Sequence, residues 1–388
     1  MNKYLAMQKN FMVNMYPNRG LVFTRGEGVC LIDAEGESYL DMMSNYGASI
    51  LGHCHAGLNE ALCRQMGALP ALHCSFTNDV RAMASRRLMQ RISKSRFQVF
   101  WSNSGAEAIE AALKLAVMAT GKRKFIACRR GYHGKTLGAL SATDGDKYRD
   151  PFRPLLWQFV HIAFDDVQAL EMTLDDDTAG FLVEPIQGEG GVFVPRPDYL
   201  REVRRICSQK KILLIVDEIQ TGAGRTGSFL ACAGESVEPD ILCMGKGLAG
   251  GLPVGATAVD SDVAARAARS SHTSTFGGNP LVCAGVNFVL DYLDENALQR
   301  IDRLGSYFRE ELLRLGDERI SAVRGKGLMI GVAFGSRRDE ILKGLQQEKV
   351  LAIPAGDDAV RFLPPYTIEK QHIDRAMDAL GAVLRRAG

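Results

Sequence analysis

Short apolar runs recur through the middle of the chain, and each is followed by a polar or glycine-containing turn and then by a helical pattern. The runs cover residues 99–101, 125–128, 181–183, 212–216 and 241–243. Strands that alternate with helices in this way predict an α/β fold with a doubly wound, mostly parallel sheet. Ligands of such sheets bind at the carboxyl ends of the strands, so the residues after each run are the first candidates for a site.

The two ends of the chain have a different pattern. Residues 4–43 contain short strands punctuated by glycine, and residues from 282 onward contain a long helical stretch (288–314), a strand region (327–334), a further helix and a final helix to Arg386. We therefore predict that residues 1–45 and 282–388 form a smaller α+β domain beside a large domain of residues 46–281.

Composition narrows the class of protein. Of the 388 residues, 46% are hydrophobic and 24% are charged, and the net charge is only +2, which is typical of a soluble globular protein and not of a nucleic-acid binder. The first residues lack the apolar core of a signal peptide, and no stretch reaches the roughly 18 apolar residues of a membrane span. The nine cysteines form no CxxC pair, so we expect reduced thiols and a cytoplasmic protein.

Two charged residues follow buried apolar runs. Asp217 follows residues 212–216, and Lys246 follows residues 241–243. A lysine amine at such a position forms a covalent imine with pyridoxal phosphate, while a buried carboxylate keeps the pyridine nitrogen protonated so that the ring accepts electrons. The two placements together predict amino-group chemistry on pyridoxal phosphate.

Residues 104–107 read Ser-Gly-Ala-Glu, which is a capping box at the start of a helix. A helix cap without a ligand is the commoner role of such a box. Because this one follows a strand and contains glycine, its free backbone N–H groups are also suited to a phosphate. Tyr132, between two glycines at another strand end, either stacks on a flat cofactor or is a core aromatic residue.

Three other segments do not match the motifs that they resemble at first sight. Residues 131–136 are not a nucleotide P-loop, because Arg129 stands where that motif needs glycine. Residues 53–55 (His-Cys-His) fit no zinc spacing. Residues 222–227 are separated from the strand before them, so they are interpreted as a flexible loop bordering the site rather than a dinucleotide fingerprint.

Six motifs occur in an order that resembles the class III pyridoxal-phosphate aminotransferases, and the acetylornithine and ornithine aminotransferase group in particular. They cover residues 103–108, 132–134, 184–191, 217–222, 245–248 and 274–280, and the likeness extends from Gly26 to Pro365. The resemblance implies a fold-type I homodimer of amino-acid metabolism with its active sites at the subunit interface.

The resemblance also implies a role for each matching residue. Lys246 carries the cofactor and then moves a proton between substrate and cofactor. Asp217 pairs with the pyridine nitrogen, and Gln220 hydrogen-bonds the ring oxygen. Ser104, Gly105 and Ala106 hold the phosphate, and we call them the phosphate cradle. Tyr132 stacks on the ring next to His133, and Thr275 comes from the partner subunit.

Family members accept both an ω-amine donor and 2-oxoglutarate in one pocket. Glu189 and Arg361 match the family's switch pair: the glutamate neutralises the arginine for one substrate and swings away so that the arginine grips the carboxylate of the other. A plain structural salt bridge is the alternative. Glu184 is expected to line the same pocket.

The resemblance leaves the amino donor open. Lys135 stands where the ornithine and acetylornithine enzymes have an arginine that binds the donor's distal carboxylate, and lysine lacks the planar fork. Tyr16 and Tyr46 align with tyrosines that border the donor pocket, whereas residues 134–140 are also similar to diamine aminotransferases. The donor is therefore acetylornithine, a related diamino acid or a diamine.

Two alternatives belong to other classes of function. An aminomutase, racemase or decarboxylase can share this scaffold and cofactor. A non-catalytic nucleotide-binding protein would leave the placements of Asp217 and Lys246 unexplained.

Overall fold

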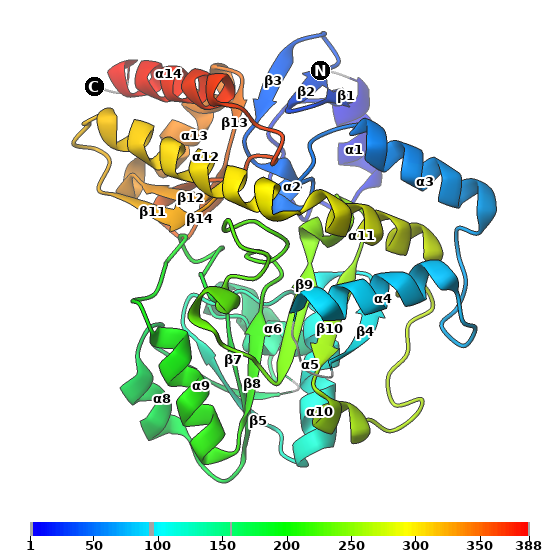
Figure 1. The fold of residues 1–388 in the computed structure, drawn as a ribbon. Helices are drawn as coiled ribbons and strands as arrows, with labels where there is room; N and C mark the ends of the chain where they lie inside the picture. Colours follow the sequence, from blue (N-terminus) through cyan, green and yellow to red (C-terminus); the bar gives the residue numbers. More distant parts are fainter. Residues whose placement is uncertain (1–2, 93–96, 156, 387–388) are drawn as a thin grey trace.

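The computed structural model describes residues 3–92, 97–155 and 157–386. In this part of the chain the strands form one seven-stranded sheet and two four-stranded sheets. Figure 1 shows the large sheet and its helices in the lower half of the molecule and the two small sheets with α12, α13 and α14 in the upper half.

The large sheet has the strand order β4-β10-β9-β8-β7-β5-β6. Neighbouring strands from β9 to β6 pair in parallel, while β10 pairs antiparallel with both β9 and β4. The predicted mostly parallel α/β sheet is therefore confirmed. Its strands are β4 (Gln98–Ser102), β5 (Lys124–Cys128), β6 (Gln158–Ile162), β7 (Thr178–Val183), β8 (Leu213–Asp217), β9 (Ile241–Gly245) and β10 (Gly255–Val259).

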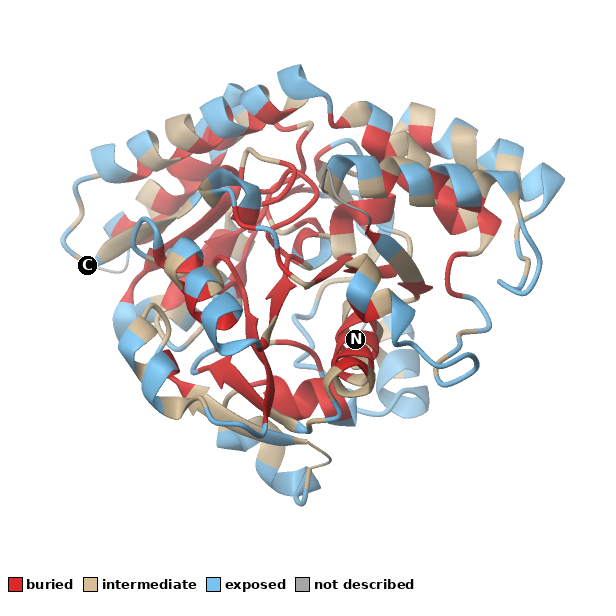
Figure 2. Ribbon diagram, turned by 60° about the horizontal axis from the view of Figure 1, so that its bottom comes forward, coloured by how far each residue is buried: buried red, intermediate tan, exposed pale blue. Residues whose placement is uncertain are grey.

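Alternate residues of the central strands pack on opposite faces of the sheet. Leu182 and Ile215 pack in the same apolar cluster as Ile109 of α5 (Gly105–Thr120), whereas Leu214 packs with Val203 of α9 (Tyr199–Lys210). Because both faces are covered, the strands are buried along their whole length, which explains their unbroken apolar runs. Figure 2 shows these buried strands in red inside an outer layer of partly exposed helices.

Further helices surround the large sheet or connect its strands. They are α2 (Ser44–Gly47), α3 (Ala56–Ala68), α4 (Asp79–Ile92), α6 (Leu137–Ala142), α7 (Asp146–Arg149), α8 (Val167–Thr173), α10 (Ser261–Ala265) and the 3₁₀ helices η1 (Asp150–Phe152), η2 (Cys232–Glu235) and η3 (Lys246–Ala249). None of the helices in the described ranges is long and apolar enough to cross a membrane.

Both ends of the chain contribute to one of the small sheets. It contains β1 (Phe23–Glu27), β2 (Cys30–Asp33) and β3 (Ser38–Asp41), and β3 pairs in parallel with β13 (Val350–Leu351) from the C-terminal part. The other small sheet contains β11 (Ala322–Lys326), β12 (Met329–Ala333), β14 (Ile353–Ala355) and β15 (Ala359–Phe362). This pairing agrees with a domain built from both ends, and the boundaries at 45 and 281 remain a prediction.

The C-terminal helices differ from the predicted pattern in one respect. The helical stretch expected at 288–314 is two helices, α11 (Pro280–Tyr292) and α12 (Glu295–Arg314), because the Asp294 side chain accepts a hydrogen bond from the backbone N–H of Ala297 (2.8 Å) and starts a new helix. The chain then continues through η4 (Gly335–Arg337) and α13 (Arg338–Gln347) to α14 (Lys370–Arg386), and it begins with α1 (Lys3–Phe11).

The sequence predicts a flexible loop bordering the site at residues 222–227. In the structure this segment is not an exposed loop. Arg225 is 1% exposed, and its guanidinium donates hydrogen bonds to the carbonyl oxygens of Leu328 (3.0 Å) and Pro364 (2.6 Å). The segment therefore fastens the large sheet to the C-terminal part of the chain.

Candidate active site

The candidate residues gather where the parallel strands end. Tyr132 follows β5, Glu184 follows β7, Asp217 ends β8, and Lys246 follows β9. These strands are adjacent in the sheet, with β5 beside β7, β7 beside β8 and β8 beside β9. Carboxyl ends of parallel neighbours lie on one edge, so residues separated by more than a hundred positions come together.

Asp217 and His133 form a buried pair. The Asp217 Oδ2 atom lies 2.8 Å from His133 Nδ1, and Asp217 Oδ1 accepts a hydrogen bond from the backbone N–H of Ile219 (2.9 Å). The two side chains are only 4% and 1% exposed. Both carboxylate oxygens are thus held, which fixes the orientation of Asp217 at the floor of the site.

Lys246 lies close to this carboxylate at the start of η3, with a backbone φ of +44°. That φ is uncommon for a residue with a side chain, and such conformations recur at active sites. Burial lowers the pKa of the Lys246 amine, and the charge of Glu189 acts in the opposite direction. A less basic amine is neutral in a larger fraction of molecules, and only the neutral amine attacks a carbonyl carbon.

The start of α5 provides free backbone donors beside Lys246. Ser104 Oγ accepts a hydrogen bond from the N–H of Glu107 (3.2 Å), so the predicted cap is present. Among the described residues, the backbone N–H groups of Gly105 and Ala106 donate no hydrogen bond. A Cβ atom placed on Gly245, the residue before Lys246, would lie only 3.4 Å from the nitrogen of Gly105. These donors and the positive end of the helix are suited to an anion.

Glu189, Arg361 and Gln220 form one network, in which Arg361 and Gln220 are buried and the Glu189 side chain is 29% exposed. Arg361 donates a hydrogen bond to Glu189 Oε1 (2.7 Å) and another to Gln220 Oε1 (2.9 Å). The Arg361 side chain is 0% exposed. Burial is the largest influence and would raise the pKa of Glu189, but the charges of Arg361 and Lys246 and the hydrogen bonds from Arg361 and Gln220 together keep that pKa below its ordinary value. The carboxylate is therefore charged and neutralises the arginine.

Glu184 connects two loops of the site. Its carboxylate accepts hydrogen bonds from the backbone N–H groups of Tyr132 (3.0 Å) and Gly188 (3.0 Å). Burial raises the pKa of Glu184 to about 7. Gly188 has no room for a side chain, since a Cβ atom there would lie 2.3 Å from Gln220 Oε1. Glu184 thus holds the loop that carries Glu189 against Tyr132.

A cavity of about 700 Å³ opens beside this network, and Tyr132, Tyr148 and Glu189 are among the residues that line it. Burial and the charge of Glu189 raise the pKa of Tyr132 to about 12. Lys135 is exposed, and its amine lies 4.6 Å from the ring centre of Tyr148. Tyr148 lies in the short helix α7 and carries no motif, so sequence reasoning missed it.

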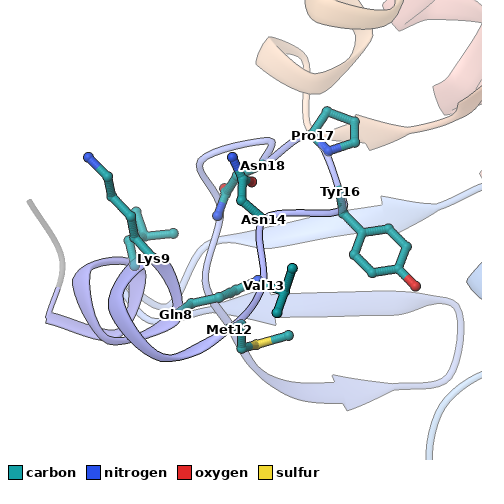
Figure 3. A pocket seen from close by; sticks show the side chains of 9 residues that line it. Gln8, Lys9, Met12, Val13, Asn14, Tyr16, Pro17 and Asn18 are labelled. Atoms are coloured by element: carbon teal, nitrogen blue, oxygen red, sulfur yellow. The ribbon is translucent and has the colours of Figure 1, made fainter. Parts of the chain in front are cut away.

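Tyr16 and Thr275 are not among the residues that line this cavity, although the charge of Tyr16 acts on Tyr132. Tyr16 is 77% exposed and lines a separate cavity of about 570 Å³ beside α1. Figure 3 shows its ring extending away from α1, on the opposite side from Lys9. Thr275 is exposed in a loop that is fastened at Ser274, whose Oγ accepts hydrogen bonds from the Asn103 side chain (3.1 Å) and the N–H of Gly277 (3.0 Å).

Comparisons with known proteins agree with this site. The family model described as "Aminotransferase class-III" matches residues 12–384. The chain is 41% identical over 383 residues to an acetylornithine aminotransferase of Methanopyrus kandleri, covering 97% of this chain and 98% of that one. It is 37% identical to a [LysW]-aminoadipate semialdehyde transaminase of Deinococcus radiodurans, covering 99% and 90%.

Solved structures give the same result. The structure resembles an ornithine aminotransferase of Toxoplasma gondii with a TM-score of 0.94 at 35% sequence identity, covering 99% of this chain and 94% of that one. An acetylornithine aminotransferase of Elizabethkingia anophelis matches with a TM-score of 0.86 at 32% identity, covering 99% and 98%.

Proposed function

The chain belongs to the class III aminotransferases and depends on pyridoxal phosphate, and from this premise we propose that it moves a terminal amino group to 2-oxoglutarate. The products are an aldehyde and glutamate. The donor is acetylornithine, a related diamino acid or a diamine. The relatives named above act on acetylornithine or on [LysW]-aminoadipate semialdehyde according to their names.

The observation that carries this proposal is the pairing of Glu189 with Arg361 beside Lys246. A transaminase must bind two different substrates in turn, and the carboxylate next to the keto group of 2-oxoglutarate needs a cation at a place where an ω-amine donor carries no carboxylate. A buried arginine that is neutralised by a movable glutamate meets both needs. An aminomutase, racemase or decarboxylase has no second substrate and needs no such pair.

The residues present fit pyridoxal phosphate. The free N–H groups of Gly105 and Ala106 suit its phosphate, Asp217 suits its pyridine nitrogen, and Lys246 supplies the amine for its aldehyde carbon. When bound, the cofactor takes up the amino group and accepts the electrons of the substrate C–H bond. In this proposal Tyr132 would cover the ring face, and Thr275 would reach the phosphate held by a second copy.

The chain's own residues then perform the proton transfers and the binding steps. The Lys246 amine, whose lowered pKa suits proton transfer, would take the proton from the donor carbon and return it on the cofactor side. Asp217, oriented by His133, would keep the pyridine nitrogen of the bound cofactor protonated. Glu189 releases Arg361 when the acid substrate enters, and the guanidinium binds that carboxylate through two N–H groups.

Assembly and location follow from the same proposal. An exposed Thr275 next to Phe276, which is 64% exposed, fits a loop that a second copy covers in a homodimer. The nine cysteines are all free in the structure, which fits the reducing conditions of the cytoplasm.

A half-reaction screen tests the proposed function. Purified, coloured protein without keto acid receives acetylornithine, ornithine, putrescine and 4-aminobutyrate in turn, and the absorbance of the lysine-bound cofactor is followed. Loss of the band with one amine and its return with 2-oxoglutarate is the expected result and identifies the donor class. A band that persists with every amine, or turnover of an amine without keto acid, would contradict transamination of these donors.

A further inference from the structure

Four consecutive residues next to the site have left-handed backbone conformations. The φ values are 45° at Ser44, 49° at Asn45, 58° at Tyr46 and 84° at Gly47. We name these residues the 44–47 turn. Three of the four carry a Cβ atom, which clashes with the backbone in this region of φ and ψ, so such residues visit it as single positions and rarely in series. The surrounding structure must therefore hold the turn in place.

Asp41 is the residue that holds the start of the turn. Its side chain is 1% exposed, and its Oδ1 accepts hydrogen bonds from the backbone N–H groups of Met43 (2.9 Å) and Ser44 (2.9 Å). The other oxygen, Oδ2, lies 2.8 Å from Nε2 of His53. All three of these hydrogen bonds involve the carboxylate of Asp41. The position therefore requires an acid whose two side-chain oxygens can both accept hydrogen bonds.

His53 is itself fixed, which prevents Asp41 from turning away. The backbone of His53 exchanges two hydrogen bonds with Gly28, at 2.7 Å and 3.0 Å. A Cβ atom on Gly26 would lie 2.7 Å from the Cβ of His53, so the histidine side chain fills the space above that glycine. The imidazole is therefore a rigid support for the carboxylate.

The turn places an aromatic ring against the arginine of the site. The Tyr46 ring centre lies 6.0 Å from the Arg361 guanidinium carbon, within the range of a cation–π interaction. The N–H of Leu363, two residues after Arg361, donates to the carbonyl oxygen of Met42 (2.7 Å). The strand end that carries Arg361 and the turn that carries Tyr46 are thus joined through the backbone.

We propose that Asp41, supported by His53, is a positioning residue that keeps the 44–47 turn in its left-handed form and so holds Tyr46 against Arg361 for binding of the acid substrate's carboxylate. The inference rests on the proposed function of Arg361. Among the described residues, the Asp41 side chain forms its hydrogen bonds with Met43, Ser44 and His53 and not with Arg361, so we expect its effect on binding to pass through Tyr46.

The test measures the dissociation constant of glutarate, an unreactive dicarboxylate, with the holoenzyme by calorimetry. Asp41→Asn keeps the size of the side chain but cannot accept all three hydrogen bonds. We expect this variant and Tyr46→Leu each to weaken glutarate binding about three- to thirtyfold, the range of a partly desolvated cation–π contact. Asp294→Asn is the matched control: it makes the same change at the cap of α12, where an asparagine oxygen can also accept the hydrogen bond from Ala297, and it should bind glutarate as the wild type does.

A double-mutant cycle separates positioning from general damage. If Asp41 acts through Tyr46, adding Asp41→Asn to Tyr46→Leu should change the dissociation constant less than about twofold. Asn45→Gly should restore part of the binding lost in Asp41→Asn, because glycine adopts positive φ without strain. Full additivity of the two losses, or wild-type binding by folded Asp41→Asn, would overturn the inference.

Arg361→Ala distinguishes this inference from the proposed function. Weak binding by Arg361→Ala together with normal binding by Asp41→Asn would refute the positioning role alone. Unchanged binding by Arg361→Ala would refute the carboxylate site and the inference with it. If Asp41→Asn does not fold, His53→Ala removes only one of the three hydrogen bonds and takes its place in the same cycle.

Discussion

Gln220 accepts a hydrogen bond from Arg361 at 2.9 Å in the interior of the site. The family resemblance assigns the Gln220 amide to the cofactor ring oxygen, and we propose that the Arg361 guanidinium binds the acid substrate. The hydrogen bond therefore links a cofactor contact to a substrate contact. A change at either residue should affect the other, because a buried guanidinium that loses an acceptor must find another or reorient.

The first prediction concerns this hydrogen bond. Gln220→Ala leaves one N–H group of Arg361 without its acceptor, so the guanidinium is less well oriented for a carboxylate. We expect KM for 2-oxoglutarate to rise about tenfold, as for loss of a hydrogen bond to a charged group. Steady-state kinetics check this, with Gln209→Ala, exposed in the last turn of α9, as the control. An unchanged KM would show that Gln220 does not orient Arg361.

The second prediction concerns the lysine. Lys246→Ala removes the only amine that we propose for cofactor attachment and proton transfer, so turnover should fall by about 10²–10⁴-fold. Borohydride reduction followed by denaturation should leave no cofactor on this variant, whereas Lys210→Ala, at the exposed end of α9, should retain it. Covalent cofactor on Lys246→Ala would exclude the assignment.

The third prediction concerns space around the phosphate cradle. Gly134 has a φ of +134°, and a Cβ atom there would lie 2.7 Å from the Cβ of Ala106. Gly134→Ala should therefore displace the cradle and weaken cofactor binding about tenfold or more. Gly67→Ala is the matched control, since nothing lies within 4 Å of its added carbon and helix propensity favours alanine. Equal cofactor dissociation constants for the two variants would contradict this account.

The fourth prediction concerns pH. Burial raises the pKa of Glu184 to about 7, above that of an unfolded glutamate. Between about pH 4.3 and 7 the folded protein keeps a proton that the unfolded chain has released, so this group's contribution to stability decreases as pH rises through that window, by at most about 1.4 kcal/mol per pH unit. Glu184→Gln cannot ionise and should lack this decrease.

Thermal unfolding of wild type and Glu184→Gln between pH 5 and 8, with equal cofactor loading, measures the difference. The wild type should lose Tm relative to the variant as the pH increases. Parallel curves would mean that Glu184 does not titrate in this window.

The fifth prediction concerns the donor. Lys135→Arg replaces a point charge next to Tyr148 with a planar fork that binds a carboxylate through two N–H groups. We expect kcat/KM for donors with a distal carboxylate to rise about five- to tenfold relative to putrescine. Lys210→Arg, at the exposed end of α9 and not among the residues that line the cavity, is the control. Unchanged donor preference would show that Lys135 does not face the substrate.

The sequence alone determined the class of fold, the family and the chemistry. Apolar runs of strand length mark strands that are buried on both faces, and Asp217 and Lys246 each stand directly after such a run. Local order along the chain was sufficient for these conclusions, because each motif is a strand end with the turn or helix that follows it. The helix cap at Ser104 could likewise be predicted from Ser104 and Glu107, which are three positions apart.

Only the tertiary structure decided which of these residues touch. His133 and Asp217 are 84 positions apart and meet because β5, β7 and β8 are neighbours in the sheet, an order that no local pattern encodes. The left-handed 44–47 turn also has no signature in its residue types: Ser44 and Tyr46 adopt positive φ in a turn whose first residues are hydrogen-bonded by Asp41, which in turn contacts His53. Backbone strain is maintained by distant contacts, and distant contacts become visible only when the chain is folded.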